Sequence, residues 1–142
     1  AYEIGVRLVG SEMCIRDSVT IALAAMPFEA AQSEFTRFKT TRRAHYEAFA
    51  PTSPGVFDTL LYNPQNELTE CTRGNVALLF DGQWLTPALH CGLLAGVGRA
   101  RYLREGVIQE AVITLGDLPR VQALAFINSL RGWVEARLVQ PG

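Results

Sequence analysis

Lysine is almost absent from this sequence. Of its 142 residues 13 are Lys or Arg, and Lys39 is the only lysine among them. Asp and Glu number 14, and the resulting net charge of −1 argues against a basic protein that coats nucleic acid. No apolar run reaches the roughly 18 residues that a membrane-spanning helix requires. With 49% apolar residues, the chain is expected to form one globular domain with a core of its own.

Cysteine is also scarce. The three cysteines are an odd number and form no C-x-x-C pair, which argues against a small disulfide-bonded scaffold and indicates a reducing compartment such as the cytoplasm. His90 and Cys91 are adjacent residues of metal-binding type, but no further cluster of Cys and His completes a site. We therefore expect no metal.

The first eighteen residues differ in character from the rest. Residues 1–18 show no helical period, no strand alternation and no signal-peptide pattern. They resemble the translation of a sequencing-library adapter, so we expect them to be adapter-derived and to lie outside the fold. Without their two Arg and three acidic residues, the remaining 124 residues hold 11 basic and 11 acidic side chains. We expect the natural chain to extend upstream of Val19.

Residues 19–142 alternate short apolar runs with turn-forming residues. Asp81-Gly82 is a strong hairpin signal, a helix is expected from Gly98 to Glu105, and Asp117 is expected to cap a further short helix. The absence of strict βαβ repetition predicts an α+β fold with antiparallel hairpins. Strands are expected over Val19–Ala24, Phe57–Tyr62, Leu68–Cys71, Asn75–Phe80, Trp84–Thr86, Val107–Leu115 and Leu124–Asn128, helices over Phe28–Phe38 and Arg42–Ala50, a turn or helix start over Ser129–Trp133, and a closing segment over Glu135–Val139.

Two segments carry candidate catalytic side chains. Arg43 follows Lys39 by four residues, so both can share a helical face, where a neighbouring cation disfavours the ammonium form, as Schiff-base chemistry requires. Strand alternation places Glu70 on the same face as Leu68, which predicts an inward carboxylate in need of a cationic partner such as a protonated pyridine nitrogen. A solvated lysine and a surface glutamate are the alternative interpretations.

Two further segments carry candidate phosphate ligands. The glycines of Gly92–Arg99 stand at a helix start, where backbone N–H groups can bind a phosphate, although the spacing matches neither the P-loop nor the dinucleotide pattern. Asn128 and Ser129 offer an amide and a hydroxyl just after a strand. An ordinary loop-to-helix connection and a helix N-cap are the alternatives for these two segments.

In this order the four segments resemble the class IV aminotransferase family of pyridoxal-phosphate enzymes. That family has a catalytic lysine before a helix, a T-E-x-x-x-N segment, a T-P strand end, an L-L-x-G-x-x-R loop and a late Ser or Thr. The corresponding residues here are Lys39, Thr69-Glu70 through Asn75, Thr86-Pro87, Leu93 through Arg99, and Ser129. The resemblance implies the large C-terminal domain of the D-amino acid aminotransferase-like fold, with a mixed sheet or pseudo-barrel and flanking helices.

The resemblance also implies a role for each residue. Lys39 would hold pyridoxal 5′-phosphate as a Schiff base and then transfer protons, and Glu70 would pair with the pyridine nitrogen. The phosphate would be held by the backbone N–H groups of Val97 and Gly98 and by the hydroxyl of Ser129.

Arg43 and Gly98 need separate comment. Arg43 would approach the phenolic oxygen of the cofactor or the substrate. Gly98 departs from the family pattern, because many relatives have Thr or Ser there as a further phosphate donor. The small N-terminal domain of the family is absent from this sequence, so we expect the chain to fold marginally and to be inactive alone.

Within the family, Lys39–Arg43 with Tyr46 and Asn128–Trp133 look most like the lyases that release pyruvate from 4-amino-4-deoxychorismate to give 4-aminobenzoate for folate synthesis. In particular, the chain resembles the lyase half that is fused behind aminodeoxychorismate synthase component I in bacterial folate synthesis. A branched-chain or D-amino acid aminotransferase would use the same Lys39 and Glu70, and a non-catalytic domain that serves assembly is a third interpretation. Relatives form homodimers, and neither a nucleic acid nor a membrane is expected as a partner.

Overall fold

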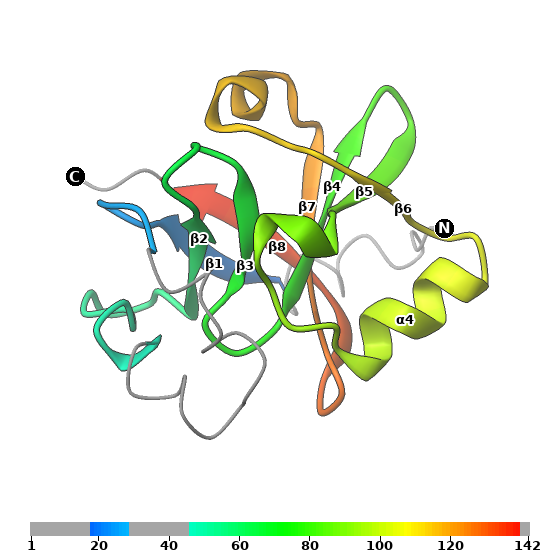
Figure 1. The fold of residues 1–142 in the computed structure, drawn as a ribbon. Coiled ribbons are helices and arrows are strands. Elements are labelled where there is room, and N and C mark those ends of the chain that lie inside the picture. Colours follow the sequence, from blue (N-terminus) through cyan, green and yellow to red (C-terminus); the bar gives the residue numbers. More distant parts are fainter. Residues whose placement is uncertain (1–17, 29–45, 140–142) are drawn as a thin grey trace.

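The computed structural model describes residues 18–28 and 46–139, which form a curled sheet with a few short helices (Figure 1). Here α denotes an α-helix and η a 3-10 helix. The helices are η3 (Leu89–Cys91), α4 (Val97–Arg104) and η4 (Leu115–Arg120). The strands are β1 (Val19–Leu23), β2 (Asp58–Tyr62), β3 (Leu68–Cys71), β4 (Asn75–Phe80), β5 (Gln83–Pro87), β6 (Gln109–Ala111), β7 (Ala123–Asn128) and β8 (Gly132–Val139).

The sheet is mixed. Its strand order is β3-β2-β1-β8-β7-β4-β5-β6. Strand β1 runs parallel to both of its neighbours, β2 and β8, and β5 runs parallel to β6. The other pairs, β2–β3, β4–β5, β4–β7 and β7–β8, are antiparallel. The mixed sheet that the sequence resemblance implied is therefore confirmed, whereas antiparallel hairpins account for only part of it.

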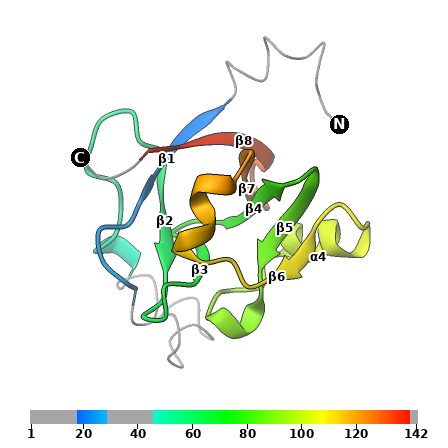
Figure 2. The ribbon, with the colours of Figure 1, turned by 90° about the horizontal axis from the view of Figure 1, so that it is seen from above.

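The two edges of the sheet meet, so the sheet forms a pseudo-barrel. The N–H of Leu68 at the start of β3 donates to the carbonyl of Ile113, which follows β6 (2.7 Å), and Leu115 donates to Asn66 (2.9 Å). Glu67 and Thr114 form an isolated bridge between the same segments. Seen from above, the strands lie around a ring whose middle is crossed by η4 (Figure 2).

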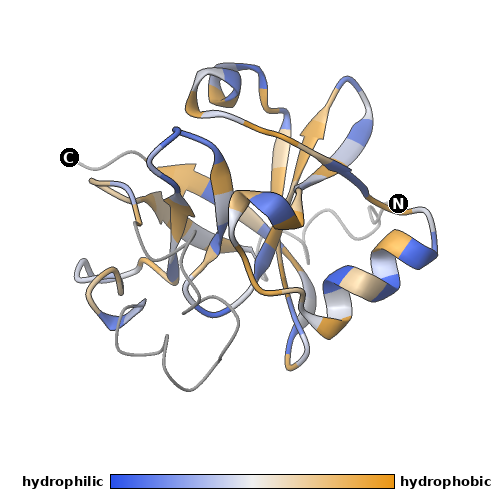
Figure 3. Ribbon diagram, in the orientation of Figure 1, coloured by the Kyte–Doolittle hydropathy of each residue, from blue (hydrophilic) through white to orange (hydrophobic). Residues whose placement is uncertain are grey.

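Strands β4 and β7 are buried on both faces. Val76, Leu78, Leu124 and Phe126 point into the main core inside the barrel. The alternate residues on these strands, which belong to a second cluster together with Ile108, are Ala77, Ala125 and Ile127. Burial of both faces explains why these strands read as nearly continuous apolar runs (Figure 3).

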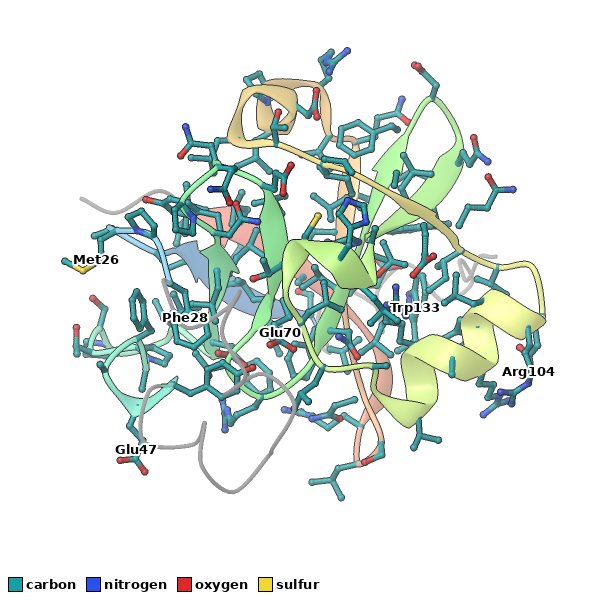
Figure 4. The ribbon with its side chains drawn as sticks, viewed as in Figure 1. Met26, Phe28, Glu47, Glu70, Arg104 and Trp133 are labelled. Atoms are coloured by element: carbon teal, nitrogen blue, oxygen red, sulfur yellow. The ribbon has the colours of Figure 1, made fainter. Side chains whose placement is uncertain are left out.

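Helix α4 packs outside the barrel against the second cluster. The indole of Trp133 on β8 contacts Trp84 edge-on, with ring centroids 4.9 Å apart, and Tyr102 of α4 at 5.2 Å (Figure 4). Such edge-to-face pairs stabilise packing beyond the area that they bury. These aromatic contacts fix where the helix lies on the sheet, and hence where its N-terminus points.

Helix η4 begins with a capping box, and its N-cap residue is not the one expected from the sequence. Asp117 was expected at the N-cap, but Thr114 is the N-cap and Asp117 stands at the third helical position, where its carboxylate accepts the Thr114 N–H. This hydrogen bond holds the pKa of Asp117 below its usual value. Of the strand expected over Val107–Leu115, only β6 is a strand. Beyond β6 the carbonyl of Ile113 accepts a hydrogen bond from the edge of β3, and the chain then turns into η4 at Leu115. The expected strand is therefore too long.

Two turns show where local sequence signals succeeded and failed. Asp81 and Gly82 have φ angles of 50° and 79°, the conformation that a two-residue hairpin needs, so this turn is confirmed. Ser129–Arg131 form a turn as one of the expected alternatives, but β8 begins at Gly132 and no helix starts there.

Three other observations complete the comparison with the sequence. The helix expected at Gly98–Glu105 is confirmed with a shift of one residue, and η3 was not expected. The helix expected over Phe28–Phe38 falls outside the described residues except for Phe28, which is not helical. Of the helix expected over Arg42–Ala50, residues 46 and 47 are helical, residues 48–50 form a turn and a bend instead, and residues 42–45 lie outside the described residues. No helix within residues 18–28 and 46–139 combines the length and hydropathy needed to cross a membrane.

Asp58 connects the start of β2 to the turn between β3 and β4 through hydrogen bonds. Its carboxylate is fully buried at the start of β2, where Oδ1 accepts the N–H of Thr59 (2.6 Å) and both the N–H (3.1 Å) and the hydroxyl (2.5 Å) of Thr72. Oδ2 accepts the N–H of Arg73 (3.0 Å). These bonds tie β2 to the turn between β3 and β4.

We expect Asp58→Asn to destabilise the protein by about 2–3 kcal/mol. The amide NH₂ of asparagine cannot accept the Arg73 N–H, and hydrogen bonds to a buried charge are worth about this much. Urea unfolding of the complete protein measures the loss. Asp81→Asn, at the exposed hairpin where asparagine tolerates the left-handed backbone, is the control and should change stability little. Equal stability of the two variants would contradict the role given to Asp58.

Candidate functional site

Glu70 lies near the middle of the molecule (Figure 4). Its side chain is 3% exposed on β3, and the inward direction predicted from strand alternation is confirmed. Carboxylate Oε1 accepts the backbone N–H of Leu94 (3.2 Å), and Oε2 accepts the hydroxyl of Tyr46. A buried carboxylate is stabilised by such donors, because burial alone disfavours its charge.

Asn75 holds the loop that precedes α4. Its side-chain NH₂ donates to the carbonyl of Leu94 (2.9 Å), and its side-chain oxygen accepts the N–H of Gly96 (3.1 Å). A methyl group on Gly96 would lie only 2.5 Å from that oxygen, so this position requires glycine. Glu70 and Asn75, from the consecutive strands β3 and β4, thus both bond to the short loop before α4.

The N-terminus of α4 adjoins the end of β7. Gly96 is the N-cap and supplies no side-chain cap, so the first-turn N–H groups, including those of Val97 and Gly98, have no partner within the helix. A methyl group on Gly98 would lie 3.8 Å from the carbonyl oxygen of Asn128. Ser129 follows directly in the exposed turn after β7. An anion at this helix end would meet backbone donors and the positive end of the helix dipole.

The side chain of Ile127 limits the space at Gly98. A methyl group on Gly98 would lie 3.0 Å from Cγ2 of Ile127, which is tighter than an ordinary contact. A threonine there would require this buried isoleucine to shift. The packing of β7 therefore disfavours a larger side chain at position 98, and the group that this residue offers to a ligand is its backbone N–H.

Arg99 fixes the orientation of α4. It is the single buried arginine of the described residues, with 2% exposure. Its guanidinium donates to the carbonyl of Pro87 (3.1 Å) at the end of β5 and pairs with the carboxylate of Glu110 on β6. The helix is thus anchored to two strands within one turn of its N-terminus.

The cysteines of the described chain are poor nucleophiles. Burial raises the pKa of Cys71 well above its usual value, and the charges of Asp58 and Glu70 add to this rise. Burial and the neighbouring Glu67 raise the pKa of Cys91 to about 11. Both thiols therefore stay protonated at neutral pH. Residues 18–28 and 46–139 contain no group of three His, Cys, Asp or Glu side chains that could hold a metal ion.

The arrangement suits a ligand with opposite charges at its two ends. Glu70 offers a buried carboxylate, and three residues beyond its partner Leu94 the helix begins with N–H groups that have no partner within the helix. One end would attract a cationic group and the other an anion.

A sequence profile described as amino-transferase class IV matches residues 12–139. The chain belongs to this family. Among curated relatives, a Schizosaccharomyces pombe protein, provisionally assigned as an aminodeoxychorismate lyase, is 30% identical over 138 residues, covering 92% of this chain and 60% of its own. The aminodeoxychorismate lyase of Saccharomyces cerevisiae is 29% identical over 135 residues, covering 81% and 36%.

A solved structure supports the same family assignment. The crystal structure of a Mesorhizobium loti protein, provisionally assigned as an amino-acid aminotransferase, is 36% identical and superimposes with a TM-score of 0.74 over 87% of this chain and 61% of its own. The class IV fold is thereby confirmed. The chain spans about 60% of the length of the first of these relatives.

Four of the six predicted site residues lie in the described part of the chain. Val97 and Gly98 stand beside the strand end that carries Ser129, and Glu70 is linked to the same loop through Leu94. The other two, Lys39 and Arg43, lie outside the described residues. Sequence reasoning assigned no role to the clamp formed by Asn75 or to the hydroxyl of Tyr46. The T-E-x-x-x-N spacing was the available signal for Asn75.

We expect Gly96→Ala to destabilise the protein by about 1–3 kcal/mol, because the added methyl group would break the Asn75 clamp. Gly116→Ala in η4 is the matched control, since a methyl group there would meet its nearest atom at an ordinary 3.6 Å. Thermal unfolding of both variants tests this. A Gly96→Ala protein as stable as the Gly116→Ala control would show that the loop does not depend on the clamp.

Proposed function

We propose that this chain is the large domain of a pyridoxal-phosphate-dependent 4-amino-4-deoxychorismate lyase of folate synthesis. The reaction breaks the C–O bond between the ring and its enolpyruvyl group. The ring loses a proton and becomes aromatic 4-aminobenzoate, while the leaving group takes up a proton and departs as pyruvate. No oxidant or second substrate is needed for this balance.

The buried carboxylate of Glu70, hydrogen-bonded to the loop that leads into α4, is the observation that carries the proposal. When bound, pyridoxal phosphate supplies an electron-withdrawing ring that stabilises negative charge on the substrate. The names of the two yeast relatives support the choice of a lyase.

The chemistry of the donor set fits this cofactor. Its phosphate would be held by the N–H groups of Val97 and Gly98 and by the hydroxyl of Ser129, at a helix end that carries no carboxylate in its first turn. Its ring nitrogen would face Glu70, whose charge keeps that nitrogen protonated.

Lys39 and Arg43 complete the proposed site. Lys39 would hold the cofactor covalently through Nζ, and the same Nζ would carry the proton between substrate atoms. Arg43 would contact the phenolic oxygen of the cofactor or the substrate. We place the protein in the cytoplasm as a homodimer, acting with or fused to aminodeoxychorismate synthase.

A class IV aminotransferase is the second candidate. The Mesorhizobium loti structure, at 36% identity, is provisionally assigned as an amino-acid aminotransferase, and this favours it. Such an enzyme would use the same Lys39 and Glu70 but would need an amino acceptor to complete its cycle.

We expect Lys39→Ala to abolish the visible absorbance of the protein-bound cofactor and to lower turnover by at least about a thousandfold, because these 142 residues contain no second lysine near the site to replace it. Absorbance spectra of the complete protein incubated with pyridoxal phosphate measure this. Arg104→Ala, which removes an exposed cation from α4, is the control and should keep the band. An unchanged band in Lys39→Ala would remove Lys39 from its role, and a wild-type protein without a band would favour the non-catalytic domain.

We expect the wild-type protein to release pyruvate from 4-amino-4-deoxychorismate without any added 2-oxo acid. A coupled assay with lactate dehydrogenase follows pyruvate, and a parallel assay follows 4-aminobenzoate in equal amount. Turnover of branched-chain or D-amino acids only when a 2-oxo acid is present would identify the aminotransferase instead.

A further inference from the structure

The hydroxyl of Tyr46 donates a hydrogen bond to Oε2 of Glu70. Both side chains are buried, with 9% and 3% exposure, and they come from segments 24 positions apart. The contact is thus a tertiary one between β3 and the helical residues 46–47, and the roles proposed above do not use it.

Aromatic packing fixes the direction of the Tyr46 ring. The ring centroid of Phe28 lies 5.0 Å from that of Tyr46, with an angle of 30° between the planes, and Phe28 also contacts Phe49 edge-on at 5.3 Å. Phe28 is itself 2% exposed and anchored through its N–H to the carbonyl of Tyr62 (2.8 Å). The tyrosine hydroxyl is therefore aimed at Glu70 by a packed core.

Two donors of the described chain reach the Glu70 carboxylate. An ionised carboxylate has about four lone-pair sites. The Leu94 N–H donates to Oε1 and the Tyr46 hydroxyl donates to Oε2. Donors to the ionised form stabilise it against the cost of burial. Without the Tyr46 hydroxyl, the charge would rest on one protein donor fewer.

We propose that Tyr46 is a positioning residue, which acts through Glu70 to keep its carboxylate ionised and directed at the ring nitrogen of the cofactor. The proposal rests on the function proposed above, because it needs a cationic ring nitrogen opposite Glu70. It adds that the proton between the ring nitrogen and the Glu70 carboxylate stays on the nitrogen. The hydrogen bond from Tyr46 makes the carboxylate a weaker base, because it stabilises the ionised form.

The hydrogen bond can be tested without the cofactor. The infrared carboxylate bands of Glu70 are isolated by subtracting the spectrum of Glu70→Gln in each background. We expect Tyr46→Phe to shift these bands in the cofactor-free complete protein. Tyr62→Phe, at a second buried tyrosine on β2, is the matched control and should leave them in place. Bands that stay unchanged in Tyr46→Phe would overturn the proposal.

A second variant covers the case in which Tyr46→Phe does not fold. Incorporation of 3-fluorotyrosine in place of Tyr46 keeps the ring packing and makes the hydroxyl a stronger donor. We expect it to shift the Glu70 bands in the direction opposite to that caused by loss of the hydroxyl. A shift in the same direction, or none, would contradict the hydrogen bond.

The consequence for the cofactor is read by nitrogen-15 NMR of pyridoxal phosphate labelled at its ring nitrogen. In the wild-type protein the shift should report a protonated nitrogen, and in Tyr46→Phe it should move toward the unprotonated value, with Tyr62→Phe as the control. An unmoved signal beside shifted infrared bands would reduce Tyr46 to a structural residue. If the wild-type protein does not bind the cofactor, the proposed function fails, and this role of Tyr46 fails with it.

Discussion

A negative charge inside the protein is the constraint on which the site depends. Glu70 places a carboxylate in a core that is otherwise largely apolar, where an unpartnered charge would cost several kcal/mol. Its two oxygens meet a backbone N–H from the loop before α4 and a hydroxyl from the segment of Tyr46. The carboxylate thereby joins two parts of the chain that contribute nothing to the sheet, and it orders both around β3.

The rest of the architecture serves this arrangement. Only the turn of residues 72–74 separates β3 from β4, so the end of β3 and the start of β4 lie close together although the two strands stand far apart in the strand order. Asn75 on β4 can therefore hold the same loop as Glu70 on β3, and Arg99 then anchors the helix that follows. Each of these polar side chains is buried and bonded to backbone groups, which gives the helix end a fixed direction. A preorganised set of donors binds an anion without the cost of ordering it first.

Much of this arrangement could be predicted from sequence, and the failures have physical reasons. Glu70 was predicted to point inward because alternation is a local property of a strand, and the Asp81-Gly82 turn was predicted because its backbone angles are local too. The end of the strand after Val107 was missed, because the chain there is recruited by the distant β3 edge. The Tyr46–Glu70 contact and the steric need for Gly96 depend on residues that only the tertiary fold brings together.

The placement of β1 has a consequence for how the protein folds. This strand, the first of the described chain, pairs on one side with β8, the last. The barrel can therefore close only after almost the whole described chain has been ordered, and closing so long a loop costs more entropy than forming any hairpin. Contacts so distant in sequence slow folding. During synthesis one edge of β1 stays unpaired until β8 has left the ribosome. An exposed strand edge invites pairing with other chains, so the vulnerable period of this protein is its own synthesis.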